Sequence, residues 1–238
     1  MITGAALCPS PPLLYPGVTG REAVLPDLRA ACADAVGRLL CDGPEMIVVV
    51  GPAPATGSWD PAGRLDPSVF APGIASTRRQ SLPLSLGLGV MLLDQAGYRG
   101  RRRLQAVGHD EPAGACVRLG SELGDSAART ALLIMGDGSA CRSLKAPGYL
   151  DPRAAGFDAE VERALRTGEL SALQRLDQAL ARDLLATGRT AWQVLSGAMR
   201  SLAPAAEILY SDHPFGVAYL VAYLKPREPA IPGSWRLG

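Results

Sequence analysis

Two uninterrupted apolar runs constrain the fold of this chain more than any other feature. Residues 46–51 read MIVVVG, and the segment 130–138 begins TALLIM. A half-exposed strand alternates apolar and polar side chains, whereas a continuous run of this kind needs cover on both faces. Strands buried on both faces are typical of a sheet between two layers of helices. The runs therefore predict an α/β protein.

Short apolar runs alternate with longer helical patterns along the rest of the chain. The expected strands are 2–8, 46–51, 102–108, 130–138, 206–212 and 216–224, and the expected helices are 26–41, 82–98, 116–123 and several within 151–202. The last two strands are close enough to pair as an antiparallel hairpin. We expect one domain over 1–224, a mixed central sheet flanked by helices, and an irregular proline-rich tail over 225–238. Segment 52–82 shows no stable period and is expected to be a loop.

Composition narrows the classes of partner and location. The formal net charge is +1, so the chain lacks the positive field that nucleic-acid binding needs. The basic run RGRRR at 99–103 is interpreted as a solvated turn. No stretch reaches the roughly 18 to 20 apolar residues of a membrane span, and the start lacks the positive leader of a signal peptide. Five scattered cysteines indicate reduced thiols. We expect a cytoplasmic protein.

The segment GDGSACRSLK (136–145), which begins where the apolar run TALLIM ends, concentrates polar side chains. Ligands of such sheets bind where the strands end, so this loop is a candidate site, together with the loops that begin at Pro9 and Gly51. The alternative is a glycine-rich turn in which Asp137 and Ser139 bind backbone amides. GxSxG, GxxxxGK[ST] and GxGxxG motifs are absent from the sequence, which gives no support to a nucleophile elbow or to nucleotide-dependent chemistry.

The motif order resembles a known superfamily. CPSPPLL, VVVGP, GDGSACR and ILYSDHPFGVAYLVA follow one another in this order, which looks like the class III extradiol dioxygenase B-subunit-like superfamily, including the Memo-type proteins. Closer still is the resemblance to an uncharacterised actinobacterial branch with CPxPPLL, MGDGSACR and KAPGYLD stretches, over residues 1–224. Active members bind Fe²⁺ through histidines and a carboxylate and cleave aromatic rings.

The resemblance matches iron-site positions to residues that are poor iron ligands. Ser10 stands where the first loop of active members has a histidine, Pro54 stands at the second histidine, and Arg142 stands at the catalytic histidine. The C-terminal glutamate has no match unless Asp212 or His213 replaces it. Proline has no side-chain donor atom and arginine is always protonated. The resemblance therefore implies a dioxygenase-like fold without its metal or any other cofactor.

Three functions stay open. The first is a protein that binds a small anionic ligand or a protein partner in the old pocket. Its ligand-binding residues would be Ser10, Gly51, Gly138, Ser139, Arg142 and Lys145, and we expect Ser10, Gly51, Asp137 and Arg142 to line one cleft. The second is a metal-independent enzyme that uses Asp137, Cys141, Asp212 or His213. The third is an Fe²⁺ ring-cleaving dioxygenase rebuilt from His109, His213 and an aspartate. A homo-oligomer is compatible with each.

Simpler structural roles stand beside these candidates. Cys141 is interpreted as a small residue that fills a turn, and Cys8 as part of the core. His213 is interpreted as a turn histidine and His109 as a solvated loop residue. Trp192 is expected in the core of a helix.

Overall fold

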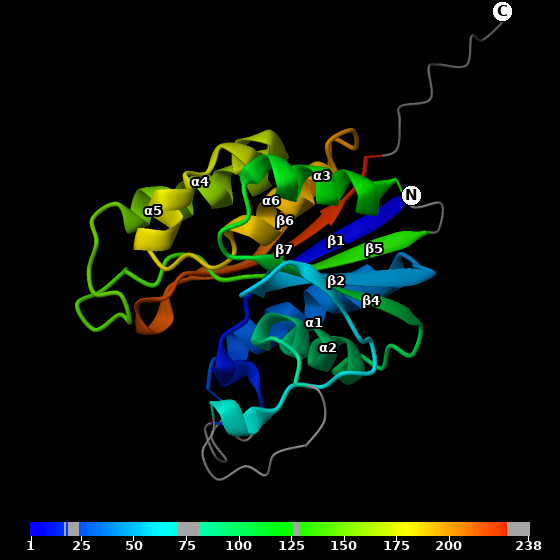
Figure 1. Ribbon diagram of the computed structural model, residues 1–238, viewed down its shortest axis with the longest axis horizontal. Helices are drawn as coiled ribbons and strands as arrows, with labels where there is room; N and C mark the ends of the chain where they lie inside the picture. Colours follow the sequence, from blue (N-terminus) through cyan, green and yellow to red (C-terminus); the bar gives the residue numbers. More distant parts are fainter. Residues whose placement is uncertain (17, 19–23, 71–80, 126–128, 228–238) are drawn as a thin grey trace, which may run out of the picture.

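A computed structural model describes residues 1–16, 18, 24–70, 81–125 and 129–227, and it is a single α/β domain. Seven strands form one sheet in the order β3-β4-β2-β5-β1-β7-β6 (Figure 1). The strands are β1 (Ile2–Cys8), β2 (Met46–Ala53), β3 (Gly57–Trp59), β4 (Arg101–Gly108), β5 (Thr130–Met135), β6 (Ala205–Asp212) and β7 (Tyr219–Lys225). The helices are α1 (Pro26–Cys41), α2 (Leu84–Gln95), α3 (Ala113–Gly124), α4 (Ala154–Thr167), α5 (Gln178–Asp183) and α6 (Arg189–Ala198).

The centre of the sheet is parallel and both of its margins are antiparallel. β4, β2, β5 and β1 run in one direction, so their carboxyl ends meet at one edge of the sheet. β3 pairs antiparallel with β4 at one margin. At the other margin β7 pairs antiparallel with β1, and β6 completes the hairpin with β7. The sheet is therefore mixed, as the sequence predicts.

The sheet divides the core into two apolar clusters. Helices α1 and α2 cover one face, and α3 to α6 cover the other (Figure 1). Successive side chains of a strand point to opposite faces, so Leu132 belongs to one cluster and Leu133 to the other. The buried cysteines divide in the same way, with Cys8 and Cys32 beside α1 and with Cys116 and Cys141 on the opposite face. This two-sided cover explains why the strands at 46–51 and 130–138 show no polar alternation.

The predicted strands and helices occur in the predicted order, but several bounds differ by up to three residues. The strand expected at 130–138 ends at Met135, and the one expected at 216–224 begins at Tyr219. The helix at 26–41 has the predicted bounds, whereas the helical block at 151–202 resolves into α4, α5, α6 and a short 3-10 helix at Leu170–Arg175. β3 lies inside the segment expected to be a loop. β7 extends to Lys225, one residue past the predicted end of the domain, and the tail from 228 onward lies outside the described residues. In the described part of the chain, no helix is both long and apolar enough to cross a membrane.

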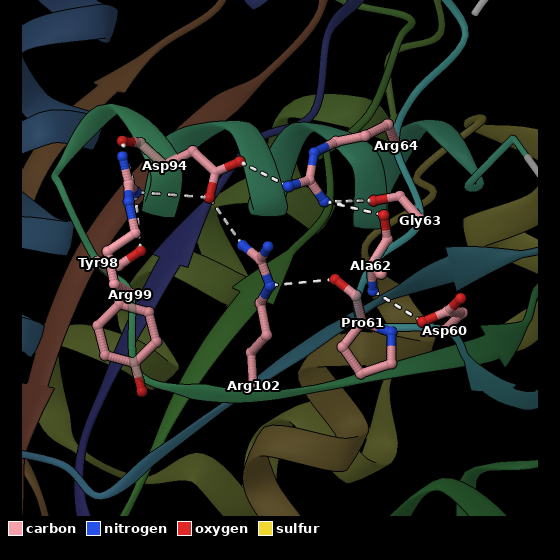
Figure 2. A network of polar contacts seen from close by, with 9 residues as sticks. All are labelled: Asp60, Pro61, Ala62, Gly63, Arg64, Asp94, Tyr98, Arg99 and Arg102. Carbon is pink, nitrogen blue, oxygen red and sulfur yellow. Dashed lines mark hydrogen bonds and ion pairs between the residues drawn. The ribbon is translucent and has the colours of Figure 1, made fainter. Parts of the chain in front are cut away.

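The basic run at 99–103 is only partly the solvated turn that its composition suggests. Its last three arginines, 101–103, begin β4. The carboxylate of Asp94 binds Arg102 at 2.8 Å and Arg64 at 3.6 Å, and it also contacts the more exposed Arg99 (Figure 2). Arg102 also donates to the backbone oxygen of Pro61 at 3.1 Å. Within the run, Arg102 thus holds the end of α2 to β4 and to the segment that follows β3.

Candidate functional site

A cavity of about 440 Å³ lies at the edge where the four parallel strands end. Ser10 follows β1, Pro54 follows β2, His109 follows β4 and Asp137 follows β5, and all four line this cavity. Loops diverge at the carboxyl ends of parallel strands, so this edge is where ligands of α/β sheets bind. We call this space the Asp137 cavity.

The carboxyl group of Asp137 is the main polar feature of this cavity. The backbone N–H of Ser10 donates to its Oδ1 at 2.6 Å. Burial raises the pKa of Asp137 to about 6, and the hydrogen bond from Ser10 opposes this shift. A carboxyl group with a pKa this close to neutrality can both give and take a proton at ordinary pH. Perturbed acids of this kind in a cavity are candidates for function.

The rest of the wall is mostly apolar. It is contributed by Pro12, Pro52, Ala53, Leu65, Phe70, Leu82, Pro83 and Leu84, with hydroxyl groups from Ser81, Ser85 and Thr187 and a second carboxyl from Asp66. The Ser85 hydroxyl is already bonded to the backbone oxygen of Pro52 at 2.7 Å. Gly51 does not line the cavity, because it lies inside β2, where a Cβ atom would collide with Ser85. An apolar wall with few polar groups is typical of sites for small organic molecules.

Arg142 lies in a different place from the one expected. It lines a second cavity of about 260 Å³, together with Gly138, Asp158, Asp212 and His213. The expected single cleft of Ser10, Gly51, Asp137 and Arg142 is therefore wrong for Arg142 and for Gly51. The reason is geometric, because the chain turns away from the sheet edge after Asp137 and the Arg142 side chain meets α4.

Asp158 of α4 holds the turn that contains Arg142. Nη1 of Arg142 donates to Oδ2 of Asp158 at 2.9 Å, and the hydroxyl of Ser139 donates to the same oxygen at 2.6 Å. The backbone N–H of Ser139 donates to Oδ1 at 2.8 Å. Ser139 is fully buried and lines neither cavity. The Ser139 and Arg142 side chains thus bind a carboxylate that belongs to the protein.

The charges around the Arg142 cavity do not favour an anion. One arginine faces three carboxyl groups, those of Asp158, Glu162 and Asp212. Lys145 is exposed and lines neither this cavity nor the Asp137 cavity. Cys141 is buried, its thiol contacts the backbone oxygen of Leu184 at 3.5 Å, and burial raises its pKa. A raised pKa disfavours the thiolate that a nucleophilic cysteine needs, and Cys141 fills the turn.

The two histidines lie in different cavities. His109 is exposed and lines the Asp137 cavity, whereas His213 follows β6 in the turn of the hairpin and lines the Arg142 cavity. Nδ1 of His213 lies 3.4 Å from Oδ1 of Asp212. Among the described residues, no group of three or more His, Cys, Asp or Glu side chains is placed to hold a metal ion. His109, His213 and an aspartate are therefore not brought together as the third open function, a rebuilt two-histidine, one-carboxylate iron site, requires.

Trp192 and Cys8 lie where the sequence predicts. Both are buried, Trp192 in α6 and Cys8 at the end of β1. Sequence reasoning missed Asp158, which is the partner of Arg142. It also missed Ser85 and Arg189, because their burial depends on how α2 and α6 pack against the sheet.

The fold and the Asp137 cavity define a single-domain α/β protein with a cavity at the carboxyl edge of a mixed sheet. No family model matches the chain, and no curated protein matches it. Among solved structures, the chain is similar to the crystal structure of an uncharacterized protein from Escherichia coli K12, with a TM-score of 0.57 and 13% sequence identity. The match covers 94% of this chain and 99% of that chain. At this identity the likeness shows the fold alone.

Proposed function

We propose that the chain binds a small, largely apolar organic molecule in the Asp137 cavity, with a hydroxyl or amine group of the ligand bonded to Asp137. The observation that carries this proposal is the partly buried carboxyl group of Asp137, whose pKa is raised by loss of water, in a mostly apolar wall at the carboxyl edge of the sheet. A cavity of about 440 Å³ is within the usual size range for small-ligand sites. A ligand donor bonded to Asp137 would compensate the cost of burying the carboxyl group.

The resemblance to the extradiol dioxygenase superfamily supports the same cavity. Ser10 and Pro54, two of the positions that it matches to iron-binding histidines, line the Asp137 cavity. On this proposal the chain keeps the pocket of the superfamily. A ligand is held there by the carboxyl group of Asp137 and not by a metal ion. The sequence favours an anionic ligand bound in part by Arg142. We do not propose an anion there, because Arg142 is already paired with Asp158.

A metal-independent enzyme is the second candidate, and the pKa of Asp137 favours it. A general acid or base works best when its pKa lies near the working pH, and Asp137 has a pKa of about 6. The proton would move between a carboxyl oxygen of Asp137 and a polar group of the bound molecule.

The experiment is a screen of small phenols, alcohols and amines by ligand-observed NMR, followed by titration of the 15N-labelled protein. We expect compounds that shift the backbone amides of Ser10 and Asp137 and that bind Asp137→Asn about tenfold more weakly, the size of one lost hydrogen bond to a charged group. The matched control is Asp212→Asn, which removes a carboxylate from the Arg142 cavity and should leave binding unchanged. Equal binding to the wild type and Asp137→Asn, or amide shifts only around Arg142, would overturn the proposal.

A further inference from the structure

A third cavity, of about 350 Å³, lies where α6 begins. Its wall includes Asp110 from the loop after β4, Arg182 from α5, and Arg189 and Thr190 from the first turn of α6. His109 and Thr187 line both this cavity and the Asp137 cavity, so the two spaces adjoin. We call this third space the α6 cavity.

Arg189 is a buried cation whose hydrogen-bond partners are all neutral. The residue is 3% exposed. Its guanidinium donates to Oε1 of Gln193 at 2.9 Å and to the backbone oxygens of His109 and Glu111 at 2.8 and 3.0 Å. These bonds use Nη1 and Nη2, and none uses Nε. They fix the guanidinium in place without neutralising it.

The carboxylates nearby are bound to other groups. The Glu111 carboxylate accepts from the hydroxyl of Thr56, and Asp110 pairs with Arg182. Within the described ranges, no carboxylate lies at ion-pair distance from Arg189. The wall of the α6 cavity therefore holds two arginines and one carboxylate, a surplus of one positive charge.

Thr190 supplies a second, independent sign of a ligand. It is 1% exposed and lines the α6 cavity, and in the part of the chain that the structure describes its Oγ1 has no hydrogen-bond partner. Buried hydroxyl groups are almost always bonded, because an unpaired one costs free energy. The start of α6 also lacks a side-chain cap, so its first backbone N–H groups have no acceptor inside the helix.

We infer that the α6 cavity is an oxyanion site, in which a carboxylate or phosphate oxygen accepts hydrogen bonds from the Thr190 hydroxyl and the first amides of α6, close to the charge of Arg189. These groups are all donors, and the positive end of a helix adds to the attraction for an anion. The site is separate from the proposed role of Asp137, since neither the donors nor the charge involves that carboxyl group.

The test is a titration of the 15N-labelled protein with inorganic phosphate and, separately, with acetate at constant ionic strength. The amides of Thr190 and Ala191 should shift and saturate with at least one of them, and the preferred anion tells whether the site takes phosphates or carboxylates. Thr190→Val has nearly the same shape without the hydroxyl, and we expect it to bind the anion about tenfold more weakly. Arg189→Gln should remove measurable binding.

Two further measurements keep the inference testable if Arg189→Gln fails to fold. Without added anion, Thr190→Val should unfold at the same temperature as the wild type or a higher one, since it removes an unpaired hydroxyl. With saturating phosphate or acetate, the wild type should gain thermal stability and Thr190→Val should gain less. Arg153→Gln, a change of an exposed arginine paired with Asp151, is the control and should bind like the wild type. The site does not exist if the Thr190 and Ala191 amides do not shift, or if Thr190→Val binds as tightly as the wild type.

Discussion

At the scale of single residues, Asp137 shows how burial sets a proton affinity. Its pKa rises from 3.8 to about 6 because the cavity wall removes water from the carboxyl group, and one backbone N–H bond does not compensate. The folded protein therefore holds this proton more tightly than the unfolded chain does. Asp137 contributes stability fully below about pH 4, and that contribution is lost as the pH rises through about 6.

Replacement of Asp137 by asparagine should therefore stabilise the protein in a pH-dependent way. The asparagine side chain would keep an oxygen for the Ser10 N–H and would carry no charge. We expect the gain in the free energy of unfolding to be larger at about pH 8 than at about pH 4, by roughly 2 kcal/mol, measured by urea unfolding. Asp125→Asn, at an exposed site, should show no such difference. A gain that is the same at both pH values would mean that the pKa of Asp137 is not raised by loss of water around its carboxyl group.

The sequence predicts part of the site at this scale. Ser10 and Asp137 could be placed together because each directly follows a parallel strand, and strand direction brings such positions to one edge. The partner of Arg142 could not be predicted, because Asp158 reaches the turn only through the rotation and packing of α4. The burial of Arg189 could not be predicted either, since an arginine in the first turn of a helix is usually exposed.

At the scale of elements, α3 and α6 approach each other unusually closely. A methyl group at Gly120 would collide with the backbone oxygen of Val194, and one at Gly197 would collide with the backbone oxygen of Val117. Glycine on both helices allows the two backbones to come together, and the contact lies in the second half of α6. The same helix contributes Arg189 and Thr190 to the α6 cavity at its other end.

Gly120→Ala should destabilise the protein by roughly 2 kcal/mol or more, because the added methyl group meets backbone atoms that cannot move aside. The matched control is Gly37→Ala in α1, where no atom lies within 4 Å of the added Cβ. That change should stabilise the protein by about 0.5–1 kcal/mol through helix propensity. The free energy of unfolding of both variants is measured in urea. Equal effects of the two changes would contradict the close approach of α3 and α6.

The sequence predicts elements best where a pattern is long. Helix 26–41 has sixteen residues and a clear apolar face, and its observed bounds match the predicted ones. β3 has three residues and lies at the edge of the sheet, so it shows no repeat long enough to detect. The block at 151–202 is helical as predicted, although its division into three α-helices and a 3-10 helix depends on tertiary packing.

At the scale of the whole molecule, the sequence predicts the α/β class and the mixed sheet but not the order of its strands. The apolar runs show that two strands are covered on both faces, and β2 and β5 are indeed neighbours near the centre. The order of the strands in the sheet depends on which strands each helical connection passes over. Local sequence patterns carry no information about this. The hairpin of β6 and β7 could be predicted because it is local, whereas its place beside β1 could not.

Because the sheet divides the core, two buried cysteines lie on each of its faces, and their reactivity can report on the opening of each helical layer. Cys8 and Cys32 are buried on the face of α1, Cys116 and Cys141 are buried on the opposite face, and Cys41 is exposed. A thiol reagent can reach a buried cysteine only when its side of the molecule opens. With Cys41 replaced by serine, labelling followed by mass spectrometry should show whether the two helical layers detach together or one at a time. Equal labelling rates for the two pairs would mean that the layers open as one cooperative unit, and unequal rates would show which layer leaves first.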